Sequence, residues 1–278
     1  MFKGFYTATT GMIAQQRRTE MLSNNIANAS TPGYKADQST VRAFPNMLLS
    51  AIEKNGKANL QNGFNPMSVQ QIGTLGTGVY MQETIPDYTQ GQLVQTDLKS
   101  DVALVDEYLP VRGDGSRTGG LYFRLQTDGQ EAYTRNGNFT VDSQGSLVTS
   151  GGNYVLSTTG EPIRVTSDDY TITEDGRVLE NNELIAQIDV AYVEDPDRLI
   201  KQDNGLYYTE DGNELTSAYD DNDIAFSMRQ GYIEQSNVDA GSTMTEMMSA
   251  YRSFEANQKM LQAYDRSMDK AVNEIGKV

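Results

Sequence analysis

The side chains that could perform chemistry in this sequence are mainly carboxylates, hydroxyls and amines. The 278 residues include no histidine and no cysteine. Ser-His-Asp and Cys-His catalysis, histidine or thiolate metal sites and disulfide bonds are therefore excluded. Paired carboxylates remain available for glycoside hydrolysis. Because the chain holds 38 aspartates and glutamates, closeness of two of them in sequence carries little information. We therefore predict a protein that is not an enzyme.

Two short stretches have the composition of ligand-binding loops. Gly113-Asp-Gly-Ser116 with Gly119-Gly120 is rich in glycine, but it lacks the strand-then-helix context of a phosphate-binding loop. Asp220-Asp221-Asn222-Asp223 lacks the glycine and the terminal glutamate of a calcium loop. A surface loop and an acidic turn are the favoured interpretations. The sequence predicts no catalytic residue, no cofactor and no metal site.

The net charge of -16 is unevenly distributed. Residues 1–35 carry +3 and residues 232–278 carry -2, which leaves -17 for residues 36–231. An acidic surface of this kind repels nucleic acid and anionic membranes. No apolar run approaches the roughly 20 residues of a membrane span, and the N-terminus lacks the apolar region of a cleaved secretory signal. We predict no nucleic-acid partner and no membrane insertion.

The longest regular pattern lies at the C-terminal end of the chain. Its members are spaced alternately four and three residues apart, without proline: Met244, Met247, Tyr251, Phe254, Gln258, Leu261, Asp265, Met268, Val272 and Ile275. This heptad pattern predicts a helix of roughly 60 Å within residues 236–278. Such a helix is too long to be buried by one compact domain, so we expect its seam to meet another helix.

A second heptad pattern lies at the N-terminal end and stops before Pro32. Its two columns are Phe5, Met12, Thr19 and Ile26, and Ala8, Gln15, Leu22 and Ala29. We predict that the two terminal helices pair as a coiled-coil-like stalk. The same seams could also bind other copies of the chain, and heptads alone do not separate these alternatives. Polar seam residues such as Gln15 and Gln258 lower stability but can fix register.

The middle of the chain changes from an irregular to a β pattern. Residues 36–79 are predicted to be an extended connecting segment with little core of its own. Residues 80–231 contain short β-prone runs, the longest being Leu184–Val193, separated by turn signals such as Asp128-Gly129 and Asn136-Gly137. We therefore predict an α+β fold: a terminal helical domain of residues 1–35 and 232–278, the connecting segment 36–79, and a central all-β domain, 80–231, that folds by itself.

Several motifs resemble those of the flagellar axial proteins, the rod, hook and hook-junction subunits. The N-terminal signature is Leu22-Ser-Asn-Asn-Ile-Ala-Asn-Ala-Ser-Thr-Pro-Gly-Tyr-Lys35, and Ser236-Asn-Val-Asp239 with Phe254-Glu-Ala-Asn257 resembles the C-terminal one. Ser100-Asp-Val-Ala-Leu104 and Tyr133–Asp142 resemble the β core of the rod and hook subfamily. The motif residues are Asn24, Asn25, Asn28, Pro32, Gly33, Tyr34, Ser236, Asn237, Val238, Asp239, Glu255 and Asn257. In one departure from the family, the segment 105–116 replaces the usual Gly-x-Gly-Phe-Phe strand.

The resemblance implies a structural axial subunit of the basal-body rod, proximal or distal. Such a subunit would self-assemble into a helical tube that transmits torque from motor to hook. The implied partners are other copies, neighbouring rod and hook proteins, and the flagellar type III export apparatus. The implied location is the basal body, reached without a cleaved signal peptide. The residues expected to pack between subunits are Phe5, Met12, Leu22, Ile26, Met244, Met247, Tyr251, Phe254, Leu261, Met268 and Ile275.

Two other classes of protein stay open at this point. One is a surface adhesin or cell-wall component with a coiled-coil stalk and a β domain, which would form a closed oligomer instead of a helical stack. The other is a carboxylate-based glycosidase acting on the cell wall, which zymography on peptidoglycan would detect.

Overall fold

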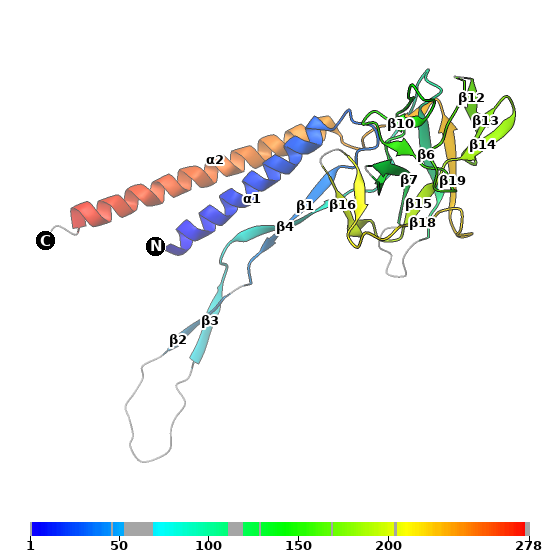
Figure 1. The fold of residues 1–278 in the computed structure, drawn as a ribbon. Coiled ribbons are helices and arrows are strands. Elements are labelled where there is room, and N and C mark those ends of the chain that lie inside the picture. Colours follow the sequence, from blue (N-terminus) through cyan, green and yellow to red (C-terminus); the bar gives the residue numbers. More distant parts are fainter. Residues whose placement is uncertain are drawn as a thin grey trace, which may run out of the picture. The chain divides into compact units, whose positions relative to one another are not determined.

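The computed structural model describes residues 2–45, 47–52, 69–110, 119–127, 129–167, 169–202 and 205–275 (Figure 1). Two long helices, α1 (Phe2–Ala27) and α2 (Ala240–Lys270), lie at the two ends of a chain whose middle is mostly β, which confirms the α+β class. The chain divides into two compact units. The helical unit comprises Met1–Ser23, Ser39–Thr84 and Gly241–Val278, and the β unit comprises Asn24–Gln38 and Ile85–Ala240. No described helix is apolar enough to cross a membrane.

The two helices contact one another in antiparallel order within the helical unit. Arg18 Nη2 lies 2.9 Å from Glu246 Oε2, Gly11 faces Asn257, and a Cβ added to Gly4 would collide with the Tyr264 ring. Glycine costs about 1 kcal/mol relative to alanine inside a helix. The two glycines, one heptad apart, are explained by the close approach of two α2 side chains that are also one heptad apart. These contacts do not establish a coiled coil along the whole length.

The face of α2 that is least exposed differs in part from the predicted seam. It consists of Thr243, Met247, Ala250, Phe254, Asn257, Leu261 and Tyr264. Met247, Phe254 and Leu261 were predicted, but the second column lies one residue earlier than expected. The expected column, called the outer column below, consists of Met244, Tyr251, Gln258, Asp265 and Val272, and all five are exposed. The glycines of α1 explain the shift, because they admit Asn257 and Tyr264.

The N-terminal seam is closer to its prediction. Leu22 is buried, Met12 and Ile26 are half-buried, and the Phe5 side chain is 44% exposed. On α2, Met268 is 36% exposed. A π-helical turn, η2 (Ala271–Ile275), follows α2, and the side chain of Ile275 lies outside the described part of the chain.

The predicted connecting segment contains paired strands. β1 (Asp37–Ala43) pairs with β4 (Val79–Pro86), and β2 (Met47–Ile52) pairs antiparallel with β3 (Val69–Leu75). Within the helical unit, Gly78 at φ +125° abuts Thr10 of α1, and the rings of Phe44 and Tyr80 lie 4.9 Å apart. This part of the chain therefore has its own local contacts.

Within the described ranges, the main sheet of the β unit has nine strands. Its path is β16 (Leu199–Lys201), β17 (Tyr207–Thr209), β8 (Gln130–Thr134), β7 (Gly120–Thr127), β11 (Tyr154–Val155), β10 (Leu147–Thr149) and β9 (Phe139–Val141), with β15 (Val190–Val193) joining β7 to β18 (Thr216–Ser217). A short helix, η1 (Pro196–Arg198), precedes β16. Leu121, Phe123 and Leu125 of β7 are fully buried in the apolar core, where Phe123 packs edge-on against Phe139.

Smaller sheets complete the β unit. β12 (Tyr170–Ile172), β13 (Arg177–Glu180) and β14 (Glu183–Gln187) form one, β6 (Val102–Tyr108) pairs with β19 (Ala225–Gln230), and β5 (Leu93–Gln95) pairs with β20 (Tyr232–Glu234). The run Leu184–Val193, predicted as one strand, is divided between β14 and β15, which belong to different sheets.

The hairpin predicted at Asn136-Gly137 is wrong. β8 pairs with β7 and β17, whereas β9 pairs with β10. Gly137 instead lies against β6: its carbonyl oxygen accepts a hydrogen bond from the Val102 amide at 2.9 Å, and a Cβ at this position would collide with the Val102 carbonyl oxygen. Glycine is therefore required here by a close backbone approach, which has the same sequence signal as a tight turn.

Candidate functional site

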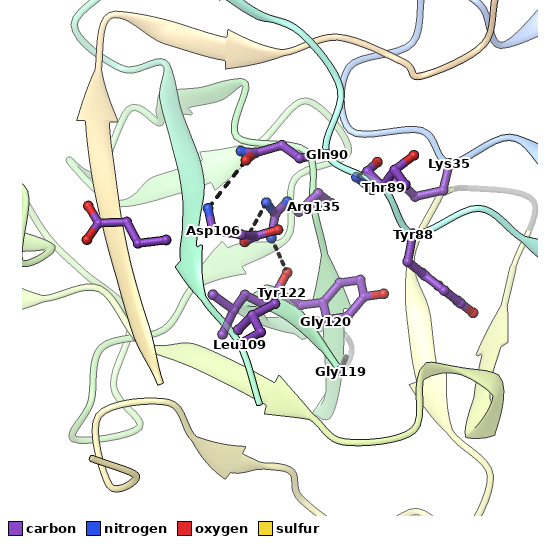
Figure 2. Close-up of a pocket in the computed structure, with 12 residues that line it drawn as sticks. Lys35, Tyr88, Thr89, Gln90, Asp106, Leu109, Gly119, Gly120, Tyr122 and Arg135 are labelled. Carbon is purple, nitrogen blue, oxygen red and sulfur yellow. Dashed lines mark hydrogen bonds and ion pairs between the residues drawn. The ribbon is translucent and has the colours of Figure 1, made fainter. Parts of the chain in front are cut away.

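Four charged side chains from separate segments meet inside the β unit and form what we call the ion-pair network. Glu234, at the end of β20, lies between two cations: its Oε1 is 2.6 Å from Lys35 Nζ and its Oε2 is 2.6 Å from Arg135 Nε. Arg135 Nη2 lies 2.9 Å from Asp106 Oδ1, and these two side chains face one another in Figure 2. The Lys35, Arg135 and Glu234 side chains are no more than 4% exposed.

Hydrogen bonds between these side chains and the backbone complete the network. The Gly91 amide donates to Glu234 Oε1 at 2.8 Å, and Lys35 donates to the carbonyl oxygen of Thr89 at 2.9 Å. Arg135 donates to carbonyl oxygens of strands in two different sheets, Leu121 of β7 at 2.8 Å and Leu104 of β6 at 3.3 Å. Buried charges are costly unless they are paired and hydrogen-bonded. Here two cations face two anions, so the cost of burial is largely offset.

Within the network, paired charges oppose the effect of burial on the pKa of Glu234 and on the pKa of Lys35. Burial alone would raise the pKa of Glu234, but Arg135 and Lys35 outweigh it and hold that pKa below its usual value. Burial lowers the pKa of Lys35, and Glu234 opposes that shift. Because the folded-state pKa of Glu234 is lowered, its stabilising contribution is present above the usual carboxyl range. It is lost as the pH falls through the lowered value.

The N-terminal motif folds back on the end of α1. The Asn25 side chain donates to the Asp37 carbonyl oxygen at 2.8 Å and accepts from the Asp37 amide at 3.0 Å. The Tyr34 hydroxyl lies 3.1 Å from the side-chain oxygens of both Asn24 and Asn25. The Lys201 ammonium lies over the Tyr34 ring, 3.8 Å from its centroid. Each of these motif side chains therefore has a local structural partner.

The segments that carry the N-terminal and C-terminal motifs hydrogen-bond to one another, and the Asn237 amide donates to the Tyr34 carbonyl oxygen at 3.4 Å. The Gly33 amide donates to the Glu234 carbonyl oxygen at 2.8 Å. The Asn237 side chain accepts from the Ala36 amide at 2.7 Å and donates to the Asp87 carbonyl oxygen at 2.7 Å. Two segments that lie 201 residues apart in sequence, from Ala36 to Asn237, thus form one structural junction.

The remaining motif residues fall into two groups. One group lies in the junction segments of the β unit: Asn28, Pro32, Ser236, Val238 and Asp239. In this group the Asn28 side chain donates to the Asn24 side chain at 2.8 Å, and the Val238 amide donates to Ser236 Oγ at 3.3 Å. Glu255 and Asn257 belong to the helical unit instead: Glu255 is exposed and pairs with Lys259 at 2.8 Å, and Asn257 faces Gly11.

Sequence reasoning missed the ion-pair network. Lys35 and Arg135 lie within motifs that the resemblance singled out, but nothing near Glu234 or Asp106 distinguishes them from surface carboxylates. A cavity of about 300 Å³ adjoins the network and is lined by Tyr88, Gln90 and Tyr122 among others (Figure 2). Within the described ranges no cluster of three or more acidic side chains is placed to hold a metal ion. The arrangement is suited to clamping chain segments together.

Replacing Gly33 with alanine should destabilise the junction. Gly33 has φ +70°, and an added Cβ would lie 2.6 Å from the Arg135 carbonyl carbon. We expect a loss of about 2 kcal/mol in the free energy of unfolding, from backbone strain and this collision, measured by chemical denaturation. Gly152→Ala is the control, because Gly152 has φ +81° but open space around it. Equal losses in the two variants would contradict a specific role for the Gly33 contact.

Three families match successive parts of the chain. The flagella basal body rod protein family matches residues 5–35, the flagellar hook protein FlgE/F/G D1 domain matches residues 118–180, and the flagellar basal body rod FlgEFG protein C-terminal family matches residues 229–274. The chain is 50% identical to the flagellar hook-basal body complex protein FlhO of Bacillus subtilis over the whole of both chains. It is 30% identical to the flagellar basal-body rod protein FlgG of Borreliella burgdorferi, over 98% of each chain. It is also 30% identical to FlgG of Bacillus subtilis, over 98% of this chain and 99% of the relative.

Proposed function

Because the chain belongs to the flagellar basal-body rod and hook protein family, we propose that it is a structural axial subunit of the basal-body rod. In this proposal it assembles with its own copies and with neighbouring axial proteins into a helical tube, and the tube transmits torque from motor to hook. It reaches the basal body through the flagellar export apparatus, without a cleaved signal peptide. The full-length match to rod proteins supports this assignment over a stalked adhesin.

The observation that carries the assembly proposal is the exposed apolar surface of the two helices. Of the seventeen large apolar residues that are at least 36% exposed in the described part of the chain, nine lie on α1, on α2 or in the turn η2 that follows α2: Phe5, Tyr6, Ile13, Met244, Met248, Tyr251, Met260, Met268 and Val272. Single exposed apolar residues are ordinary, but a set of them on adjoining elements is typical of an interaction surface. We propose that this surface is covered by other subunits.

The position of the outer column on α2 indicates which kind of contact between subunits it would make. One face of α2 contacts α1 of the same chain, and the outer column lies beside that face. A second column that carries the exposed apolar residues Met244, Tyr251 and Val272 allows the helix to pack against a second partner. A contact between different faces of identical subunits is heterologous, and repeated heterologous contacts that do not close form a helical filament.

Deleting the gene for this chain in its source bacterium tests the proposed function. We expect basal bodies purified from a deletion strain to retain the membrane-embedded parts and to lack a completed rod and hook, with loss of swimming. Expression of the intact chain should restore both. Complete rods in the deletion strain would contradict the proposal, and a fixed, closed oligomer of the purified chain in mass photometry would favour the adhesin instead.

A further inference from the structure

We infer that residues 24–38 form a strap that is latched onto the β unit by Glu234, and that opening the latch uncouples the end of α1 from the beginning of α2. The strap carries the last turn of α1, and Glu234 lies six residues before the first residue of α2. The consequence for assembly rests on the proposed function, but the latch itself is a property of the single chain.

The strap is a structural piece of its own. Its internal hydrogen bonds join Asn25 to Asp37 and Tyr34 to Asn24 and Asn25. It is separated from the rest of the β unit by residues 39–84, which belong to the helical unit. The strap is therefore held in the β unit by its contacts with residues 85–240, which follow it in sequence only after residues 39–84.

The contacts that hold the strap are mainly polar, and Tyr34 is its buried aromatic residue. They include the Lys35–Glu234 ion pair, the Gly33 amide to the Glu234 carbonyl oxygen, the Ala36 amide to Asn237, and the Asp87 amide to the Ala36 carbonyl oxygen at 2.7 Å. Lys201 adds a contact to the Lys35 carbonyl oxygen and covers the Tyr34 ring. Among the described residues, the two apolar core clusters of the β unit include no member of the strap. The strap can therefore leave without opening the core.

Closure of the latch depends on the Glu234 side chain. It is faced by Lys35 from the strap, by Arg135 from the segment after β8 and by the Gly91 amide from the segment before β5. Asp106 of β6 lies on the far side of Arg135. If Glu234 loses its charge, Arg135 keeps Asp106 and two carbonyl oxygens, all within residues 85–240. Lys35 keeps the Thr89 carbonyl oxygen but loses its buried anion. The loss therefore weakens the attachment of the strap more than the core.

The latch matters because it joins the bases of both helices. Asn24 and Asn25 lie in α1 and bind Tyr34 and Asp37 of the strap, and the strap binds Glu234 and Asn237, just before α2. With the latch closed, the last turn of α1 and the segment just before α2 are held together within the β unit. With it open, each base moves separately, as expected for a subunit that orders its ends only on assembly.

Hydrogen exchange on the intact, dilute chain tests the latch in Glu234→Gln, a variant of similar shape without the charge. We expect amide exchange over residues 28–38 to be at least about tenfold faster than in the parent. This is the change expected when the equilibrium constant for local opening rises tenfold. Exchange over 121–127 and 190–193, within the core strands, should stay unchanged. Asp169→Asn is the matched control, because Asp169 pairs with Lys99 at the same 2.6 Å but both side chains are exposed.

Each result has a definite meaning. Faster exchange in the strap alone supports the latch. Unchanged strap exchange overturns it, and equal acceleration of strap and core also overturns it, because the strap would then be part of one cooperative unit. If Glu234→Gln does not fold, Lys35→Met decides by the same criteria, since it removes the charge on the strap side and leaves the Glu234–Arg135 pair intact. These measurements use monomers, so failure of rod assembly would not affect them.

Discussion

Replacing Arg135 with methionine should destabilise the β unit by about 3–5 kcal/mol, the range measured when one partner of a buried ion pair is removed. Arg135 is the one member of the described network that touches both carboxylates, Glu234 and Asp106. Its loss would leave Asp106 without this cation and would remove a donor from the Leu121 and Leu104 carbonyl oxygens. Methionine replaces most of the aliphatic stem, so the effect reports the charge and its hydrogen bonds more than lost volume.

Chemical denaturation followed by circular dichroism measures this loss. Lys99→Met is the matched control, because Lys99 also pairs with a carboxylate, Asp169, but its side chain is 59% exposed. Exposed ion pairs contribute little, so this variant should unfold almost as the parent does. If Arg135→Met and Lys99→Met had the same stability, the network would not hold the β unit together, and its burial would have no energetic consequence.

The sequence predicts the helices of this protein well because their signal is local. Heptads at both ends, free of proline, place α1 and α2 to within a few residues. The sequence does not specify which columns of α2 face α1. That choice depends on Gly4 and Gly11, which accept Tyr264 and Asn257, and the fit of a small residue to a large one is a property of the pair of helices.

The β unit shows where local signals mislead. The turn at Gln144-Gly145 lies between β9 and β10, which pair with each other, and Gly145 has φ +82°. Asn136-Gly137 gives an equally strong signal but serves a close approach to Val102. The ion-pair network is harder still to predict from the sequence. Glu234 and an exposed glutamate such as Glu255 differ only in the residues that the fold places around them. The predicted boundary at residue 231 leaves Glu234 outside the β domain, and independent folding of 80–231 stays a prediction.

Replacing Tyr251 with aspartate should abolish assembly and leave the single chain nearly intact. Tyr251 belongs to the outer column of α2, and its side chain is 61% exposed, so little packing is lost in the monomer. In the proposed assembly, the same side chain is covered by another subunit. A carboxylate there would be buried without a partner, which costs several kcal/mol per contact, and each subunit of a filament would repeat that cost. We expect normal helix content and a normal melt, with no completed rods and no swimming.

Ala256→Asp is the control that makes this result specific. Ala256 is exposed on the same helix, about 140° around it from Tyr251 at 3.6 residues per turn, and the change introduces the same charge in place of a better helix former. Loss of swimming in both variants would point to a general effect of aspartate in α2. Full swimming by Tyr251→Asp would show that the outer column is not covered in the rod, and the assembly surface would then have to lie elsewhere. Loss in Tyr251→Asp alone, with normal secretion of both proteins, assigns the outer column to contacts between subunits.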